Sequence, residues 1–173
     1  MKQGYFLIIK DEYYKKYDSN EILMNNKGPG HNRPCFFAFP DKREQAILWC
    51  VPISSQVEKY EKVVAYKTRN QKGKKKTCIT IRFGNVMGHK KAFLIQNMFP
   101  IIDAYVDNIY VDKNTNNPVT VSSELEKDII VSAKKVLKLV YYGNPQLVFA
   151  DVKEMYNMLV EEIMSDAEYE SEK

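Results

Sequence analysis

The 173-residue sequence predicts an α+β fold, a compact and strongly curved antiparallel sheet resembling a small β-barrel, with added helices including two at the C-terminus. Short apolar and β-branched segments separated by turn residues fill the chain up to about residue 120. The apolar residues then recur at helical spacing. The composition, 45% hydrophobic and 28% charged, is that of a globular domain and excludes a disordered chain.

The N-terminal part of the chain is predicted to form strands. Tyr5–Ile9 is an apolar run typical of a buried strand, and Glu12–Tyr17 forms a turn of helix at most. Ser19–Pro34 contains so many Gly, Pro and Asn residues that it predicts a long loop, and such a loop in a small domain is usually functional or mobile. Cys35–Phe39 and Ala46–Val51 are predicted to pair as a hairpin.

The middle of the chain is predicted to hold a second strand pair. Val63–Tyr66 pairs in this interpretation with Thr77–Phe83, and the basic loop Lys67–Lys76 joins them. Further short strands are expected at Ala92–Leu94, Ala104–Val106 and Ile109–Val111.

Two helices are predicted to close the chain. Ser123 and Glu126 form a capping box in front of an apolar stripe, and this helix should stop at Gly143. Asp151 with Glu154 opens the second helix. The length predicts a single domain, residues 1–164, followed by an acidic segment, 165–173, that is expected to be disordered.

The sequence also predicts a cytoplasmic protein. No apolar run approaches the 18 residues of a membrane span, and the first residues lack the apolar stretch of a secretory signal. The three cysteines are widely spaced in apolar surroundings, which predicts free, buried thiols in a reducing compartment: Cys35, Cys50 and Cys78.

The charge is unevenly distributed along the chain. The net charge is +4, but Glu161–Lys173 carries six acidic residues and one basic residue, so positions 1–160 have 25 basic and 16 acidic residues, a net of +9. Between Lys59 and Lys91, eleven positive charges face only Glu61. Because such a segment repels itself, it predicts a polyanionic partner. A solvated lysine-rich loop is the alternative.

The motifs of many enzyme classes are absent. The sequence has no Walker loop, no Cys-x-x-Cys pair and no Gly-x-Ser-x-Gly elbow, and its two histidines, His31 and His89, are far apart. These absences favour chemistry without a metal or cofactor, or plain binding.

Two local clusters remain as candidate sites. His31 lies in the flexible segment Gly28–Arg33, and Ser54 and Ser55 directly follow a strand, with Lys59 four residues beyond. Taken singly, the serines could cap a helix and the histidine could belong to an ordinary surface loop. Together they match metal-independent RNA cleavage, in which the ribose 2′-hydroxyl attacks its own phosphate. That reaction needs a base, an acid and donors to the phosphoryl oxygens.

The order of several short motifs resembles a known family. A tyrosine soon follows the first strand, Pro-Ile-Ser-Ser ends another, and Leu94–Ile102 reads Leu-Ile-Gln-Asn-Met-Phe-Pro-Ile-Ile. Over roughly Tyr5 to Met164 the chain is similar to the toxins of type III toxin–antitoxin systems, the ToxN/AbiQ/CptN group, and most of all to its CptN branch. The resemblance implies a MazF/PemK-like barrel with added helices. It also implies a phage-defence endoribonuclease that processes, and is inhibited by, its own repeat antitoxin RNA, a pseudoknot, in a closed toxin–RNA hetero-oligomer.

The resemblance also assigns residues. The family's early active-site tyrosine falls on Tyr13, its loop tyrosine on His31, and its Thr-Ser pair on Ser54 and Ser55. A lysine that follows the family's loop proline is replaced here by Cys35.

The hypothesis is therefore a metal-independent endoribonuclease that leaves 2′,3′-cyclic phosphate and 5′-hydroxyl ends on cellular and antitoxin RNA. His31 would transfer protons, Ser54 and Ser55 would contact the phosphate, Tyr13 would position it, and Lys59, with Lys62 as the other candidate, would stabilise charge. The residues expected to bind RNA are Arg33, Lys62, Lys67, Arg69, Lys72, Lys74, Lys75, Lys76, Lys90 and Lys91.

Two other functions are compatible with the charge. A non-catalytic RNA-binding barrel, such as a regulator or ribosome-associated module, explains the basic residues equally well but has no use for the serines and the histidine together. A DNA-binding regulator is less favoured, because no predicted helix pair carries a basic face suited to the major groove.

Overall fold

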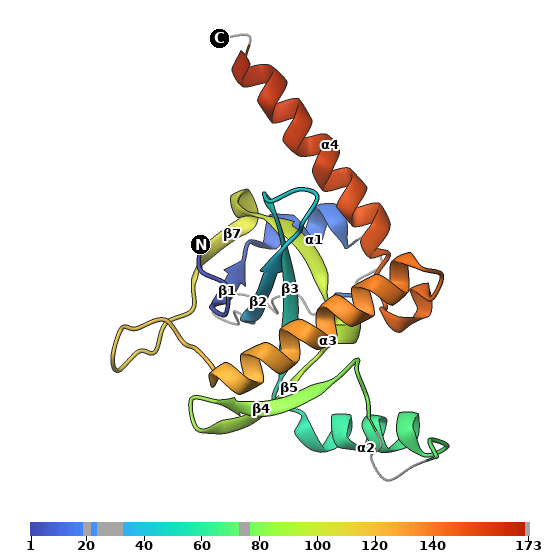
Figure 1. Ribbon diagram of the computed structural model, residues 1–173. Coiled ribbons are helices and arrows are strands. Elements are labelled where there is room, and N and C mark those ends of the chain that lie inside the picture. Colours follow the sequence, from blue (N-terminus) through green and yellow to red (C-terminus); the bar gives the residue numbers. More distant parts are fainter. Residues whose placement is uncertain (19–21, 24–32, 73–76, 172–173) are drawn as a thin grey trace.

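The structure, a computed structural model, describes residues 1–18, 22–23, 33–72 and 77–171. Its centre is an antiparallel sheet of seven strands with the order β4-β5-β3-β2-β1-β7, in which β6 also pairs with β3 (Figure 1). The strands are β1 (Phe6–Ile9), β2 (Cys35–Pro40), β3 (Ile47–Ser54), β4 (Arg82–Val86), β5 (His89–Phe93), β6 (Phe99–Ile102) and β7 (Val106–Ile109). The helices are α1 (Asp11–Tyr17), α2 (Val57–Thr68), α3 (Ser123–Tyr141) and α4 (Val152–Ser171), with short 3-10 helices η1 (Ile95–Asn97), η2 (Asp103–Tyr105) and η3 (Pro145–Leu147).

The long strand β3 determines the shape of the sheet. Along one edge it pairs with β2, as the predicted hairpin requires. Its first half also pairs with β6, from Ile47 opposite Ile102 to Cys50 opposite Phe99, and its last two residues pair with β5. The antiparallel sheet is thus confirmed, but the sheet is open and does not close into a barrel among the described residues. Likeness to the MazF/PemK barrel stays a prediction.

The strands β1, β2 and β3 form the core because both of their faces are covered. Every residue of β1 is buried, as are nearly all those of β2 and β3. The helix α3 crosses the sheet and packs on β2, and α4 packs on β6 (Figure 1). Cys35 and Cys50 are buried in this core as free thiols, and Cys78 is free and half-buried, so the prediction of free cysteines is confirmed.

The predicted strand Val63–Tyr66 is wrong, because these residues lie inside the helix α2. The β-branched and aromatic residues of this segment have high strand propensity, but they also recur at helical spacing. Tyr60, Val63 and Val64 pack on the small apolar cluster of Ile81, Ala92 and Leu94. Tertiary packing therefore decided the structure here. The predicted partner strand begins at Arg82, five residues later than expected.

The two C-terminal helices are confirmed, with differences at their ends. The N-cap of α3 is Ser122 and not Ser123, and its hydroxyl accepts a hydrogen bond from the Leu125 amide at 3.3 Å. The helix ends before Gly143, whose φ of +106° is the left-handed conformation that glycine adopts readily. Asp151 caps α4, as predicted, through bonds from the amides of residues 153 and 154. Instead of the expected disordered tail, α4 continues to Ser171.

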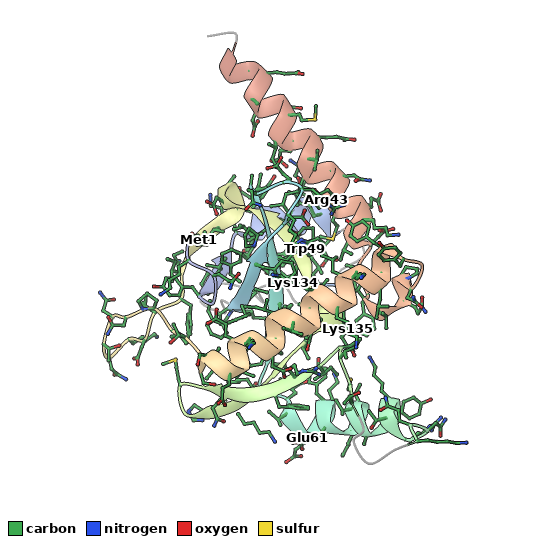
Figure 2. The ribbon with its side chains drawn as sticks, in the orientation of Figure 1. Met1, Arg43, Trp49, Glu61, Lys134 and Lys135 are labelled. Atoms are coloured by element: carbon green, nitrogen blue, oxygen red, sulfur yellow. The ribbon has the colours of Figure 1, made fainter. Side chains whose placement is uncertain are left out.

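Aromatic contacts fix the first half of α4 to the sheet. Tyr156 of α4 stacks on Trp49 of β3 with an interplanar angle of 8°, and the Trp49 indole donates to Asp41 at 2.9 Å. The Arg43 guanidinium lies 4.2 Å from the centre of the Tyr156 ring. Figure 2 labels Arg43 and Trp49 in this region. The second half of α4 projects away from the rest of the molecule (Figure 1). No helix in the described part of the chain is both long enough and apolar enough to cross a bilayer.

Candidate nucleic-acid interface

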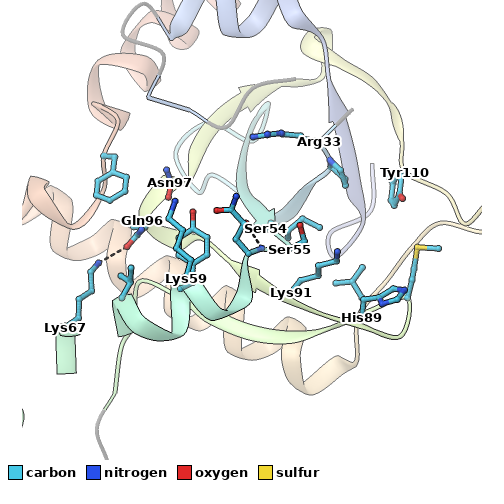
Figure 3. Close-up of a pocket in the computed structure, with 18 of the residues that line it drawn as sticks. Arg33, Ser54, Ser55, Lys59, Lys67, His89, Lys91, Gln96, Asn97 and Tyr110 are labelled. Carbon is cyan, nitrogen blue, oxygen red and sulfur yellow. Dashed lines mark hydrogen bonds between the residues drawn. The ribbon is translucent and has the colours of Figure 1, made fainter. Parts of the chain in front are cut away.

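One cleft of about 1030 Å³ brings together most of the predicted site residues that the structure describes (Figure 3). It lies where the end of β3 meets α2, β5 and η1. Its polar and charged lining includes Ser54 and Ser55 from β3 and the turn after it, Lys59 and Lys67 from α2, His89 and Lys91 from β5, and Gln96 and Asn97 from η1.

The cleft carries charge of one sign. Arg33, Lys59, Lys67 and Lys91 line it, and none of the described residues that line it is acidic. Cations that converge on a concave surface focus the electrostatic potential and attract anions. The cleft is therefore suited to a ligand with several negative charges.

The two serines occupy different positions at the end of β3. Ser54, 9% exposed, pairs with Ala92 of β5, and its hydroxyl accepts a hydrogen bond from the Gln56 amide at 3.2 Å. This bond turns the chain from the strand into α2. Ser55 is exposed within the cleft. The N-cap of α2 is Gln56, so neither serine has the capping position that was the simplest alternative to a functional role.

Strand β5 presents His89 and Lys91 to the cleft. Side chains two residues apart on a strand point to the same face, so these two residues share one side. Lys90 points the other way, where its ammonium forms an ion pair with Glu61 at 2.7 Å. Lys90 and Lys91, although adjacent in the chain, therefore have different surroundings.

Helix α2 supplies two more cations from one face. Lys59 and Lys67 are eight residues apart, close to two helical turns, and both line the cleft, whereas Lys62 is exposed and does not line it. Lys67 is held in place because its ammonium donates to Gln96 at 2.7 Å and to Thr80 at 3.1 Å. Of Lys59 and Lys62, the two lysines predicted as alternatives for the active site, Lys59 is the one that lines the cleft.

Tyr60 adds a polar aromatic group beside Lys59. Burial raises the pKa of the Tyr60 phenol, and the positive charge of Arg33 opposes this shift. The phenol is therefore protonated at neutral pH and can donate a hydrogen bond to an anion in the cleft.

Several predicted site residues do not lie in the cleft. Tyr13 is fully buried among aromatic rings, and its hydroxyl donates to the backbone carbonyl of Pro100 at 2.5 Å. Burial raises the Tyr13 pKa well above its ordinary value. This corrects the expectation that Tyr13 lies beside the substrate, because its polar atom is used in the core.

The other predicted RNA-binding residues are dispersed. Lys62, Arg69, Lys72 and Lys90 do not line the cleft, and the Arg69 guanidinium lies 4.0 Å from the centre of the Tyr66 ring. Four residues lie outside the described part of the chain, and their predicted roles stay predictions: His31, Lys74, Lys75 and Lys76.

The structure adds residues that were not singled out from the sequence. His89, Gln96, Asn97 and Phe149 all line the cleft. The alternation of His89 and Lys91 next to the apolar residues 92–94 is a signal that could have placed His89 beside Lys91. Phe149, which is 52 residues beyond Asn97, carries no such signal. In the described ranges, no group of three or more His, Cys, Asp or Glu residues is placed to hold a metal ion.

Comparison with known proteins identifies the fold. No family model matches the chain, and no curated protein matches it significantly. Among solved structures, the chain matches AbiQ, a lactococcal anti-phage endoribonuclease belonging to the type-III toxin-antitoxin system, with a TM-score of 0.65. The sequences are 13% identical, and the match covers 99% of this chain and 100% of AbiQ. The whole chain thus has the fold of a member of the group that its sequence resembles.

Proposed function

We propose that this chain is a metal-independent endoribonuclease toxin of a type III toxin–antitoxin system. The observation that carries the proposal is the cleft itself, where two adjacent serines, a histidine and four cations meet and none of the described lining residues is acidic. The fold supports it, since AbiQ, which has the same architecture, is an endoribonuclease.

The cleft supplies the groups that RNA transesterification needs. The ribose 2′-oxygen forms a bond to phosphorus while the bond from phosphorus to the 5′-oxygen breaks, which leaves a 2′,3′-cyclic phosphate and a 5′-hydroxyl. A base takes the 2′-hydroxyl proton, and an acid returns a proton to the 5′-oxygen. His89 is the histidine that lines the cleft and can serve one proton role, while His31 stays the predicted candidate for the other.

The remaining residues of the cleft would bind the phosphate. Ser55, with Ser54 next to it, would donate hydrogen bonds to the phosphoryl oxygens, and Lys59 and Lys91 would stabilise the charge that develops there. Donors of this kind, fixed before the reaction by the end of β3 and by α2, act without reorganisation.

The proposal extends to the partners and setting of a type III toxin. The RNA that fills the cleft between catalytic events would be a small repeat antitoxin RNA, folded as a pseudoknot, that the toxin cuts from its precursor and that inhibits it in a closed hetero-oligomer. The cationic lining fits an RNA backbone in either role, as substrate or as inhibitor. The protein would act in the cytoplasm on cellular RNA.

The test is cleavage of end-labelled RNA in buffer with a metal chelator. We expect wild-type protein to produce cyclic phosphate ends, and Ser55→Ala to reduce the cleavage rate by about 100-fold or more while RNA binding is retained. Ser165→Ala is the matched control, because Ser165 is an exposed serine of α4 outside the cleft. Its rate should equal that of wild type.

Each outcome has a clear meaning. If wild-type protein binds RNA but leaves it intact, the chain is the non-catalytic RNA-binding protein of the alternative hypothesis. If Ser55→Ala cuts at the wild-type rate, the serine pair has no part in the chemistry.

A further inference from the structure

Asn97 has an unusual position at the wall of the cleft. It ends η1, and only 7% of its surface is exposed. Its Oδ1 atom is the single buried side-chain nitrogen or oxygen of the described residues that has no hydrogen-bond partner. Because buried polar groups are nearly always hydrogen-bonded, such an atom needs an explanation. A donor on a ligand in the cleft would provide one, after a small rotation of the amide.

The adjacent amide is already in use. Gln96 is 4% exposed, and its Oε1 accepts a hydrogen bond from the Lys67 ammonium. Lys67, which also donates to Thr80, therefore holds Gln96 in one position and leaves a positive charge beside Asn97. In Figure 3, Lys67, Gln96 and Asn97 lie to one side of the two serines, and His89 lies to the other. The cleft thus continues past the serines toward η1.

An exposed aromatic ring lines the same cleft. Phe149 is 54% exposed, although a phenylalanine of a small domain is usually buried. Its backbone amide donates to the Gln96 carbonyl at 2.9 Å, and this bond fixes the residue next to η1. A partly exposed ring that lines the same cleft as Lys67 and Asn97 has the features of a stacking surface for a nucleobase.

We infer that this end of the cleft is a subsite for one unpaired nucleobase next to the scissile phosphate, with Asn97 reading its edge and Phe149 stacking on its face. An asparagine amide offers one acceptor beside one donor, so it can pair with an adjacent donor and acceptor on the edge of an unpaired base. The edge and the face are both available only in an unpaired base. The inference rests on the proposed function, and it makes Asn97 the residue that selects which phosphodiester is cut.

The test uses uncleavable 2′-fluoro uridine hexamers in which one position at a time is changed to adenosine, cytidine, guanosine or an abasic residue. Fluorescence anisotropy measures the Kd of each hexamer. At one position we expect wild-type protein to bind one of the four bases about 10-fold more tightly than the others, and Asn97→Ala to remove this preference while leaving affinity for the abasic hexamer unchanged.

A second variant tests stacking without disturbing the core. Phe149→Ala should weaken binding of every base at that position by about 10-fold and leave the abasic hexamer unaffected, while Phe149→Tyr should bind like wild type. Tyr142→Ala is the control, because Tyr142 is 77% exposed and lies outside the cleft. Thermal melting reports whether each variant is folded. If Asn97→Ala fails to fold, the Phe149 variants decide the question alone.

The inference is overturned if no position shows a base preference, or if the variants weaken the abasic hexamer as much as the others. The readout is equilibrium binding of RNA that cannot be cut, so it does not depend on cleavage. Wild-type protein that leaves ordinary RNA intact but binds these hexamers with base selectivity would refute the nuclease and keep the subsite.

Discussion

Two neighbouring lysines of β5 provide a matched test of which surface binds RNA. Lys91 lines the cleft, whereas Lys90 points away from it and forms an ion pair with Glu61. Lys91→Met and Lys90→Met remove the same charge from adjacent residues and keep similar side-chain volume. If RNA binds in the cleft, only the first change removes a phosphate contact.

The number of cations in the cleft determines how strongly RNA binding should depend on salt. Four basic side chains line it, and if each neutralises one phosphate, the plot of log K against log salt has a slope of about −2.8, from −0.7 per contact for a single strand. Raising the salt from 50 to 200 mM should then weaken binding by about 50-fold. Lys91→Met should reduce the slope to about −2.1 and the loss of affinity to about 18-fold, while Lys90→Met should leave both near the wild-type values.

The assay is a salt series of anisotropy titrations with an uncleavable single-stranded RNA. Basic residues outside the cleft, such as Lys72, add equally to all three slopes, so the comparison rests on the difference between the two variants. Equal slopes for Lys90→Met and Lys91→Met would refute the assignment of this cleft as the RNA site, and a flat salt response of wild type would refute every polyanionic partner.

Two further predictions concern stability, measured by urea unfolding. Burial acts to raise the pKa of Glu162, but hydrogen bonds from Lys16, Tyr17 and Tyr105 outweigh it and lower the pKa below its ordinary value of 4.5. Glu162→Gln should therefore lower the free energy of unfolding by about 1 kcal/mol at pH 7. Because the carboxylate becomes protonated in acid, the difference between the variant and wild type should shrink as the pH falls below about 4.5. A difference that does not change with pH would contradict this reasoning. A Cβ atom on Gly84 of β4 would lie 2.0 Å from a methyl carbon of Leu125 of α3, so Gly84→Ala should destabilise the protein by about 1–3 kcal/mol. A Cβ atom on Gly88 would meet no neighbouring atom, so the cost of Gly88→Ala, about 1 kcal/mol, should come only from its left-handed φ of +77°.

The fold was predictable to the extent that it depends on local pattern. The hairpin of β2 and β3, the first strand and both C-terminal helices follow from the spacing of apolar residues and from capping residues such as Asp151. The segment Val63–Tyr66 was mispredicted because its strand propensity and its helical spacing conflict, and packing on the cluster around Leu94 resolves that conflict.

The candidate site was predictable only in part. Ser54 and Ser55 could be found because both adjacent hydroxyls follow a strand directly, and Lys59 because it lies one helical turn further on. Tyr13 was placed beside the substrate by family resemblance, but its ring packs in the aromatic core around Phe99 and its hydroxyl donates a hydrogen bond to the Pro100 carbonyl.

The sequence by itself determined the sign of the charge along the chain, with an excess of cations in its middle. It also determined the spacing of the apolar residues, which predicts strands followed by helices, and it placed a serine pair where a strand ends. These are properties of neighbouring residues, which local backbone geometry is sufficient to express. Only the tertiary structure decided which cations share the cleft, that Glu61 forms an ion pair with Lys90, and that Asn97 is buried at the wall of a cleft that Phe149 also lines. Those facts depend on contacts between residues far apart in the chain, because burial and electrostatic surroundings are properties of the packed molecule and not of any segment of it.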